Sequence, residues 1–216
     1  MLKLEKCQKI FIDFDGVIVD SNKFKELSIE KAIIKIIGKN KKSTQAINYF
    51  NLNAGISREL KLSLFFDKNI INKILKIYSE ECTKFFLEAI PTTGLNEFLK
   101  YLKDNHKQIK IYILSGGEKN EILSFISRHK LLPFFEDILA SNKTKVNHLK
   151  EKQVCKNDIF IGDSKNDLNS SLHFGLKFIL FDEFKSKESY PDKELIKDNV
   201  FLKTKNFVSL LEKIIS

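Results

Sequence analysis

The chain has 216 residues, of which 43% are hydrophobic and 30% are charged, and its formal net charge is +9. This length and hydrophobic content predict one folded domain, or a domain with an insertion, and exclude an intrinsically disordered chain. Three separated cysteines without CxxC spacing exclude a disulfide framework, and no apolar run approaches the ~20 residues that span a bilayer. We therefore expect a cytoplasmic protein with no membrane partner.

Short apolar runs, rich in β-branched and aromatic residues, alternate with helix-like segments along most of the chain. The runs predict strands at Lys9–Phe14, Ile109–Leu114, Asp158–Ile161 and Lys177–Phe181, with Glu136–Ala140 as a weaker candidate. Helical periodicity is found at Leu95–Leu102, Asn120–Leu131, Lys145–Lys152, Asp167–Phe174 and Asn206–Ile214. This alternation predicts an α/β fold, in which a Rossmann-like parallel sheet carries helices on both faces.

The interval from residue 21 to residue 89 interrupts the alternation. It has helical patterning and no convincing strand, and Pro91 and Gly94 follow it where the chain returns to the sheet. The interval is far longer than an ordinary crossover between parallel strands, which needs about a dozen residues or more. We expect residues 21–89 to form an inserted all-helical cap subdomain, and residues 1–20 and 90–216 to form the Rossmann-like core.

Polar residues follow three of the predicted strands. They are Asp13 and Asp15 at the end of the first strand, Ser115, Gly116 and Gly117 after the second, and Asp163 and Asp167 after Asp158–Ile161. Carboxylates gathered at one edge of a sheet repel one another unless a cation joins them, and oxygen ligands suit Mg²⁺. Each motif alone has a plainer interpretation as a strand-to-turn boundary, a loop or a helix N-cap. Together they favour a magnesium site that handles phosphate.

At these residues the chain resembles the haloacid dehalogenase-like hydrolase superfamily. Within it the chain is similar to phosphatases with a helical cap after the first strand, of the phosphoglycolate phosphatase and beta-phosphoglucomutase type. The run Asp13–Ser21 resembles the family's DxDGxxxDS motif, Ser115 occupies its second motif, and Gly162–Asp167 resembles its GDSxxD motif. The family's third motif is a lysine, for which Lys145 and Lys143 are both candidates. Lys145 is favoured because it precedes a helix-like segment.

The resemblance implies a mechanism and assigns roles to these residues. Asp13 would be the nucleophile that forms an aspartyl-phosphate, and Asp15 would be the general acid and base. Mg²⁺ would be held by the Asp13 and Asp163 carboxylates and the Asp15 carbonyl, with Asp167 binding directly or through water. Ser115, the Gly116 amide and Lys145 would stabilise the transferring phosphoryl group.

Two basic residues of the predicted cap are candidates for substrate binding. Arg58 and Lys61 are three residues apart, so they share a face if a helix begins near Ser57. Arg58 is one of only two arginines beside 35 lysines, and a guanidinium can bind a carboxylate or a phosphate with two hydrogen bonds. We expect the pair to read an anionic or hydroxyl-rich leaving group. The alternative is an exposed helix whose arginine only solvates the surface.

These residues predict a magnesium-dependent phosphatase that acts on a small phosphorylated metabolite, such as a sugar phosphate. A phosphomutase of the beta-phosphoglucomutase type is an alternative, because it uses the same chemistry at Asp13 and Asp15. The net charge of +9 raises a third possibility, a nucleic-acid-binding module. Lysines are scattered through nearly every predicted helix rather than clustered, so we expect no nucleic-acid partner.

Overall fold

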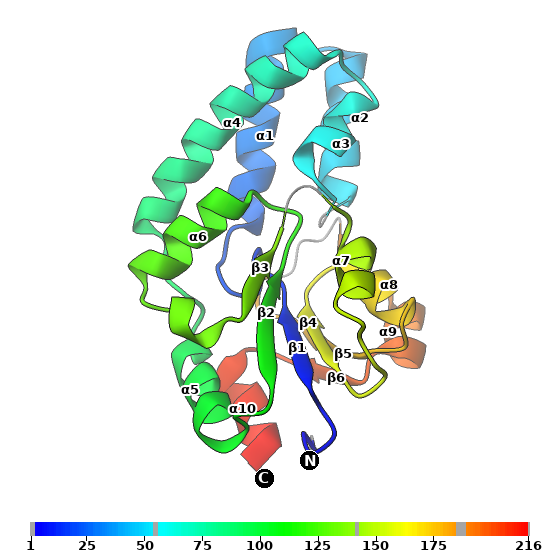
Figure 1. The fold of residues 1–216 in the computed structure, drawn as a ribbon. Coiled ribbons are helices and arrows are strands. Elements are labelled where there is room, and N and C mark those ends of the chain that lie inside the picture. Colours follow the sequence, from blue (N-terminus) through cyan, green and yellow to red (C-terminus); the bar gives the residue numbers. More distant parts are fainter. Residues whose placement is uncertain (1–2, 54–55, 141–142, 185–188, 216) are drawn as a thin grey trace.

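The computed structural model describes residues 3–53, 56–140, 143–184 and 189–215, and within these residues it contains one six-stranded sheet (Figure 1). The strands are parallel and lie in the order β3-β2-β1-β4-β5-β6. Their bounds are β1 Lys9–Ile12, β2 Lys110–Leu114, β3 Asp137–Leu139, β4 Ile159–Gly162, β5 Lys177–Phe181 and β6 Leu202–Thr204. This order places the carboxyl ends of β2, β1 and β4 side by side, which is where ligands bind in such sheets.

Both faces of the sheet are buried because alternate side chains of each strand enter different apolar layers. Ile10, Ile12, Ile111, Ile113 and Ile161 share one layer with the helices α5 (Leu95–Asn105), α6 (Lys119–Arg128) and α10 (Phe207–Ile215). Phe11, Tyr112, Leu114, Phe160 and Phe178 share the other with α7 (Lys145–Glu151), α8 (Lys165–Leu172) and α9 (Lys193–Asn199). The predicted α/β class, with a parallel sheet between two helical layers, is confirmed.

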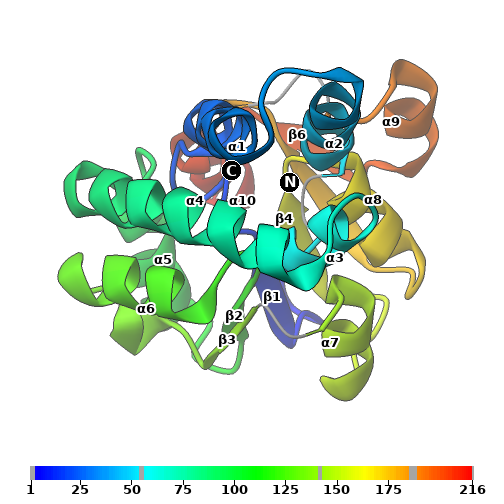
Figure 2. The same cartoon turned by 90° about the horizontal axis from the view of Figure 1, so that it is seen from above.

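Among the described residues, four helices lie between β1 and α5. They are α1 (Asn22–Ile37), α2 (Lys41–Leu52), α3 (Arg58–Ser63) and α4 (Lys68–Glu88). All four lie beyond the carboxyl ends of the strands, at the top of Figure 1 and nearest the viewer in Figure 2. Side chains of Asn40, Ser57 and Asp67 cap the amino ends of α2, α3 and α4. These caps satisfy backbone N–H groups that a helix start leaves unpaired, which fixes where each helix begins.

The chain leaves the sheet for these helices and returns to it at one place. Val19 and Pro91 form an antiparallel bridge there. The Thr92 amide donates to the carbonyl of Ile18 at 2.9 Å, and the Thr92 hydroxyl donates to the carbonyl of Val17 at 2.6 Å. This paired connection holds α1 and α4 close to the loop that follows β1.

The structure departs from the sequence pattern in three places. The first strand ends at Ile12, two residues before the predicted end, and a turn begins at Phe14. The strand β6 and the helix α9 were not predicted: β6 has three residues, and α9 buries none of its residues fully. The boundaries proposed for a separate cap subdomain stay a prediction. Within the described residues, no helix is long and apolar enough to cross a membrane.

Candidate active site

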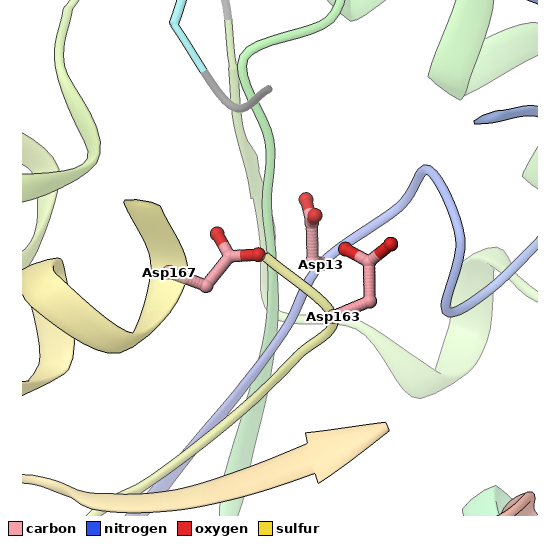
Figure 3. Close-up of side chains that lie close together, drawn as sticks. All are labelled: Asp13, Asp163 and Asp167. Carbon is pink, nitrogen blue, oxygen red and sulfur yellow. The ribbon is translucent and has the colours of Figure 1, made fainter. Parts of the chain in front are cut away.

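Three carboxylates meet at the carboxyl ends of two neighbouring strands. Asp13 follows β1, Asp163 follows β4, and Asp167 lies in the first turn of α8. β1 and β4 pair directly, and the Asp13 amide donates to the carbonyl of Ile161 at 2.9 Å. One oxygen of each carboxylate lies within 4.8 Å of the others, and all three residues are buried (Figure 3). The fold thus gathers three of the four acids that the sequence suggested as metal ligands.

Lys145 lies against the same cluster, at the start of α7. Its ammonium is 2.8 Å from Asp13 Oδ1 and 2.5 Å from Asp167 Oδ1. Burial alone lowers the pKa of Lys145, but the two carboxylates more than offset this, so the pKa lies above its ordinary value. Lys143, the other candidate for the family's lysine, is on the surface and pairs with Glu151 at 2.6 Å. The geometry therefore separates the two lysines, and Lys145 is the one beside Asp13.

The donor set fits a divalent cation. Burial and the charge of Asp167 raise the pKa of Asp13, and burial and the charge of Asp13 raise that of Asp163. Burial is the larger cause of both shifts, and repulsion between the carboxylates adds to it. Lys145 balances one of the three negative charges, and the remaining two match the charge of Mg²⁺.

The three carboxylates are not equally available to such a cation. Both Asp167 oxygens already accept hydrogen bonds, Oδ1 from Lys145 and Oδ2 from the amide and hydroxyl of Ser164. Asp13 and Asp163 each keep one carboxylate oxygen to which no described residue donates. Asp13 and Asp163 are therefore placed to bind a metal directly, and Asp167 is placed to orient Lys145.

Two glycines allow the acidic segments to approach this closely. Gly16 has φ of +76°, and a Cβ at this position would collide with the side chains of Asp163 and Asn22. A Cβ at Gly162 would lie 2.6 Å from the Cβ of Asp167. Any larger residue at either position would push the carboxylates apart.

Asp15, the fourth acid, is not part of the carboxylate cluster. Its Oδ1 is 2.5 Å from the ammonium of Lys25, on α1, and accepts a hydrogen bond from the Ser21 hydroxyl at 2.6 Å. Burial alone raises the pKa of Asp15, but Lys25 and Ser21 lower it more, so the pKa lies below its ordinary value. The Asp15 side chain is thus held as a carboxylate by the first helix after β1.

Ser115 ends the neighbouring strand. Its amide donates to the carbonyl of Leu139 at 2.9 Å, and its hydroxyl oxygen accepts from the Gly117 amide at 2.9 Å. These bonds fold the Ser115–Gly117 loop back on itself just before α6 begins. A Cβ at Gly117 would lie 3.2 Å from the hydroxyl of Ser115 and 3.5 Å from a carboxylate oxygen of Asp15. The second predicted motif therefore lies close to the first.

A pocket lies between these strand ends and the helices α1 to α4. Its lining comes from the sheet edge (Asp13, Asp15, Ser115, Gly116, Gly117 and Asp163), from α1 to α4 (Asn22, Lys25, Glu26, Phe50, Asn51, Arg58, Lys61 and Tyr78), and from Ile56 and Ser189. Most of the predicted site residues thus share one pocket. The other two, Lys145 and Asp167, lie beside Asp13.

Arg58 is buried rather than exposed. Its side chain is 6% accessible, and α3 begins at Arg58 with Ser57 as its N-cap, as expected. The guanidinium donates to both carboxylate oxygens of Glu121, at 2.9 and 2.7 Å, and lies 4.8 Å from the centre of the Tyr78 ring. The exposed-helix interpretation of Arg58 is therefore wrong. The arginine lines the pocket, but its charge is already balanced by a carboxylate on α6.

Arg128, the second arginine, also links α6 to the helices that follow β1, but here the arginine is on α6 and its acceptors are at the end of α4. It lies at the end of α6 and donates to the backbone carbonyls of Phe86 and Ala89, at 2.5 and 2.8 Å. Both arginines of the chain thus join α6 to the helices inserted after β1. This shared placement explains why guanidinium groups, with several donors each, are used here.

Sequence reasoning missed several residues of the site. Lys25 forms an ion pair with Asp15, and Glu121 forms one with Arg58. Neither residue is distinguished in the sequence from the many other charged residues of the chain. Asn22, on α1, donates to Asp163 at 2.6 Å. Its position directly after the DxDGxxxDS motif was the one available signal. Gly55 and Ser141, which lie close to Arg58 and Lys145 in the sequence, are outside the described residues.

Comparison with solved structures finds proteins with a similar fold. The fold is similar to a haloacid dehalogenase-like hydrolase of Streptococcus pneumoniae, with 19% identity, a TM-score of 0.68 and coverage of 96% of this chain and 98% of that one. It is also similar to a predicted phosphoglycolate phosphatase of Haemophilus somnus, with 12% identity, a TM-score of 0.72 and coverage of 98% of this chain and 99% of that one. A third similar structure is a beta-phosphoglucomutase of Clostridium difficile, with 18% identity, a TM-score of 0.70 and coverage of 93% of this chain and 92% of that one.

The sequence itself supports a family assignment more strongly than these distant structures do. No curated protein matches the chain significantly. The sequence model of the haloacid dehalogenase-like hydrolases, in contrast, matches residues 10–181, which include Asp13, Ser115, Lys145 and Asp163. The chain therefore belongs to the haloacid dehalogenase-like hydrolases.

Proposed function

We propose that the enzyme is a magnesium-dependent phosphatase that acts on a small phosphorylated metabolite, such as a sugar phosphate. One observation carries the proposal: the buried Asp13 carboxylate lies at a pocket, 2.8 Å from the Lys145 ammonium and beside Asp163. A carboxylate in this position is a nucleophile next to two sources of positive charge, a lysine and a cation site. Phosphoryl transfer needs this combination because the attacked group is itself an anion.

The metal would be held by the carboxylates of Asp13 and Asp163 and by the backbone carbonyl of Asp15. Asp167, whose two oxygens already accept hydrogen bonds from Lys145 and Ser164, would contribute through water. When bound, Mg²⁺ neutralises the phosphate charge that would otherwise repel the nucleophile. The Asn22 side chain, which donates to Asp163 at 2.6 Å, keeps that carboxylate oriented toward the site.

The first step is an in-line attack by an Asp13 oxygen on phosphorus. The bond from phosphorus to the ester oxygen breaks, the leaving group departs as an alcohol, and an aspartyl-phosphate remains on Asp13. Lys145, the Ser115 hydroxyl and the Gly116 amide stabilise the equatorial oxygens of the transferring group. Water then attacks the same phosphorus, which releases phosphate and restores the carboxylate.

Asp15 handles the protons of both steps. It donates a proton to the leaving oxygen in the first step and takes one from the attacking water in the second. The ion pair with Lys25 holds Asp15 in the ionised form that the second step needs. Donation in the first step requires the protonated form, so Lys25 has to release Asp15 before the leaving group departs.

The direct test is phosphate release from a panel of phosphorylated metabolites, with Mg²⁺ and with EDTA, by the wild type and by Asp13→Asn. We expect magnesium-dependent release by the wild type and none above background by the variant. A beta-phosphoglucomutase is among the similar structures, and a phosphomutase would interconvert hexose phosphate isomers without net phosphate release. Binding of duplex or single-stranded nucleic acid at moderate salt, with no phosphate release, would favour the nucleic-acid alternative.

A further inference from the structure

The pocket contains one buried ammonium, that of Lys61, whose charge no described carboxylate balances. Lys61 lies on α3, one turn after Arg58, and the residue is 6% exposed. Its Nζ donates to the backbone carbonyl of Phe50 at 3.1 Å and lies 3.5 Å from the centre of the Phe50 ring. A carbonyl and a ring face attract a cation, but neither carries a negative charge.

The other basic residues of the site differ in this respect. Arg58 is paired with Glu121, and Lys25 is paired with Asp15. Lys145, which lies beside the pocket, forms ion pairs with both Asp13 and Asp167. Among the described residues, Lys61 is thus the cation of the pocket that lacks a carboxylate partner. Burying a charge without a counter-ion is costly, so an unpaired ammonium in the pocket that Asp13 also lines calls for an anionic ligand.

A second unpartnered group lies at the same end of the pocket. The side-chain oxygen of Asn51 is buried, lines the pocket with Lys61, and accepts no hydrogen bond from any described residue. Asn51 directly follows Phe50, whose carbonyl binds the Lys61 ammonium. A buried carbonyl-type oxygen needs a donor such as a hydroxyl group. The pocket that Asp13 and Asp163 line thus also offers one position for an anion and one for a hydroxyl.

We infer that the enzyme prefers phosphate monoesters whose leaving group carries a second anion, and that Lys61 binds this anion. The inference rests on the proposed phosphatase function and narrows its substrate class to small hydroxylated molecules with a carboxylate or a second phosphate. Arg58 lines the pocket, but its charge is already neutralised by the ion pair with Glu121 and is not available to bind the substrate. Lys61, rather than the arginine singled out by composition, is then the residue that determines specificity.

The test compares substrates that differ only in the second anion. Glycerol 3-phosphate and 3-phosphoglycerate form the carboxylate pair, and glucose 6-phosphate and glucose 1,6-bisphosphate form the phosphate pair. We expect the wild type to favour the anionic member of at least one pair. Because a hydrogen bond to a charged group contributes about 1.5–3 kcal/mol, the ratio of kcat/KM within that pair should fall about 10- to 100-fold in Lys61→Met and Lys61→Gln. The control Lys76→Met removes an exposed lysine of α4 and should keep the wild-type ratio.

The outcome stays readable even if turnover fails. Calorimetric binding of 3-phosphoglycerate and glycerol 3-phosphate to Asp13→Asn, with and without Lys61→Met, measures the same preference without catalysis. A preference for the anion that disappears with Lys61 supports the inference in either assay. Equal treatment of both pairs by the wild type, or a preference that survives both Lys61 substitutions, overturns it. Absence of hydrolysis for every ester, including p-nitrophenyl phosphate, contradicts the phosphatase proposal instead.

Discussion

Replacing Lys61 by methionine should raise the stability of the fold, although it removes a side chain that is almost fully buried. Methionine has nearly the same length and is neutral, so it fills the space without a charge. Burial, together with the positive charges of Lys25 and Arg58, lowers the pKa of Lys61 to about 7, and Asp15 opposes this only in part. The wild-type fold therefore holds an ammonium that would be more stable in water.

The size and pH dependence of this cost follow from the pKa. One pH unit between the folded and unfolded pKa values corresponds to about 1.4 kcal/mol, so lowering the pKa of Lys61 from 10.5 to about 7 costs the charged form about 5 kcal/mol. The charge of Lys61 destabilises the fold by this full amount below pH 7. The destabilisation decreases as the pH rises from 7 to 10.5, and it is absent above pH 10.5. Lys61→Met also loses the contacts with the Phe50 carbonyl and ring, and this loss reduces the gain in stability by about 2 kcal/mol.

Thermal unfolding of the wild type, Lys61→Met and the control Lys76→Met at pH 6 and at pH 9 tests this reasoning. A net gain of about 3 kcal/mol raises the midpoint of a chain of this size by on the order of 10 °C at pH 6. The gain should be smaller at pH 9, and the control should not change. A Lys61→Met variant that unfolds at a lower temperature than the wild type, or whose difference is the same at both pH values, would refute the unbalanced-charge account.

Three further substitutions test other parts of the site. Asp15→Asn should leave Mg²⁺ affinity in calorimetry nearly unchanged while turnover falls on the order of 10²-fold or more, because the side chain transfers protons; near-normal turnover would exclude that role. Lys145→Met should abolish turnover and Lys143→Met should not, and the reverse result would reassign the lysine. Arg58→Ala should lower the free energy of unfolding by about 3–5 kcal/mol, because the mostly buried Glu121 carboxylate loses its partner; unchanged denaturant unfolding would contradict the importance of this pair.

The positions of the candidate site residues at the strand ends could be predicted because they follow directly from the order of strands and turns. Asp13, Ser115 and Asp163 each follow a short apolar run, and parallel strands bring their carboxyl ends to one edge. The sequence also placed Arg58 and Lys61 on one helical face. It could not distinguish which of the two is neutralised, because Glu121 lies 63 residues from Arg58 in the chain.

Other parts of the structure left too little trace in the sequence. Lys25 is one lysine among 35, and only the fold brings it to Asp15. β6 is too short to produce a recognisable alternation, and the exposed surface of α9 weakens its periodicity. Pairings between distant segments depend on packing, which the residue pattern of a single chain does not encode locally.

The central claim is that Asp13 accepts the phosphoryl group in a magnesium-dependent hydrolysis. Acid quenching of the enzyme during turnover of its best substrate, followed by mass spectrometry of the peptides, measures this directly. The account predicts a phosphoryl adduct on the peptide that contains Asp13, present with Mg²⁺ and absent in EDTA and in Asp13→Asn. Phosphate release that continues in Asp13→Asn, or an adduct on another residue, would contradict it.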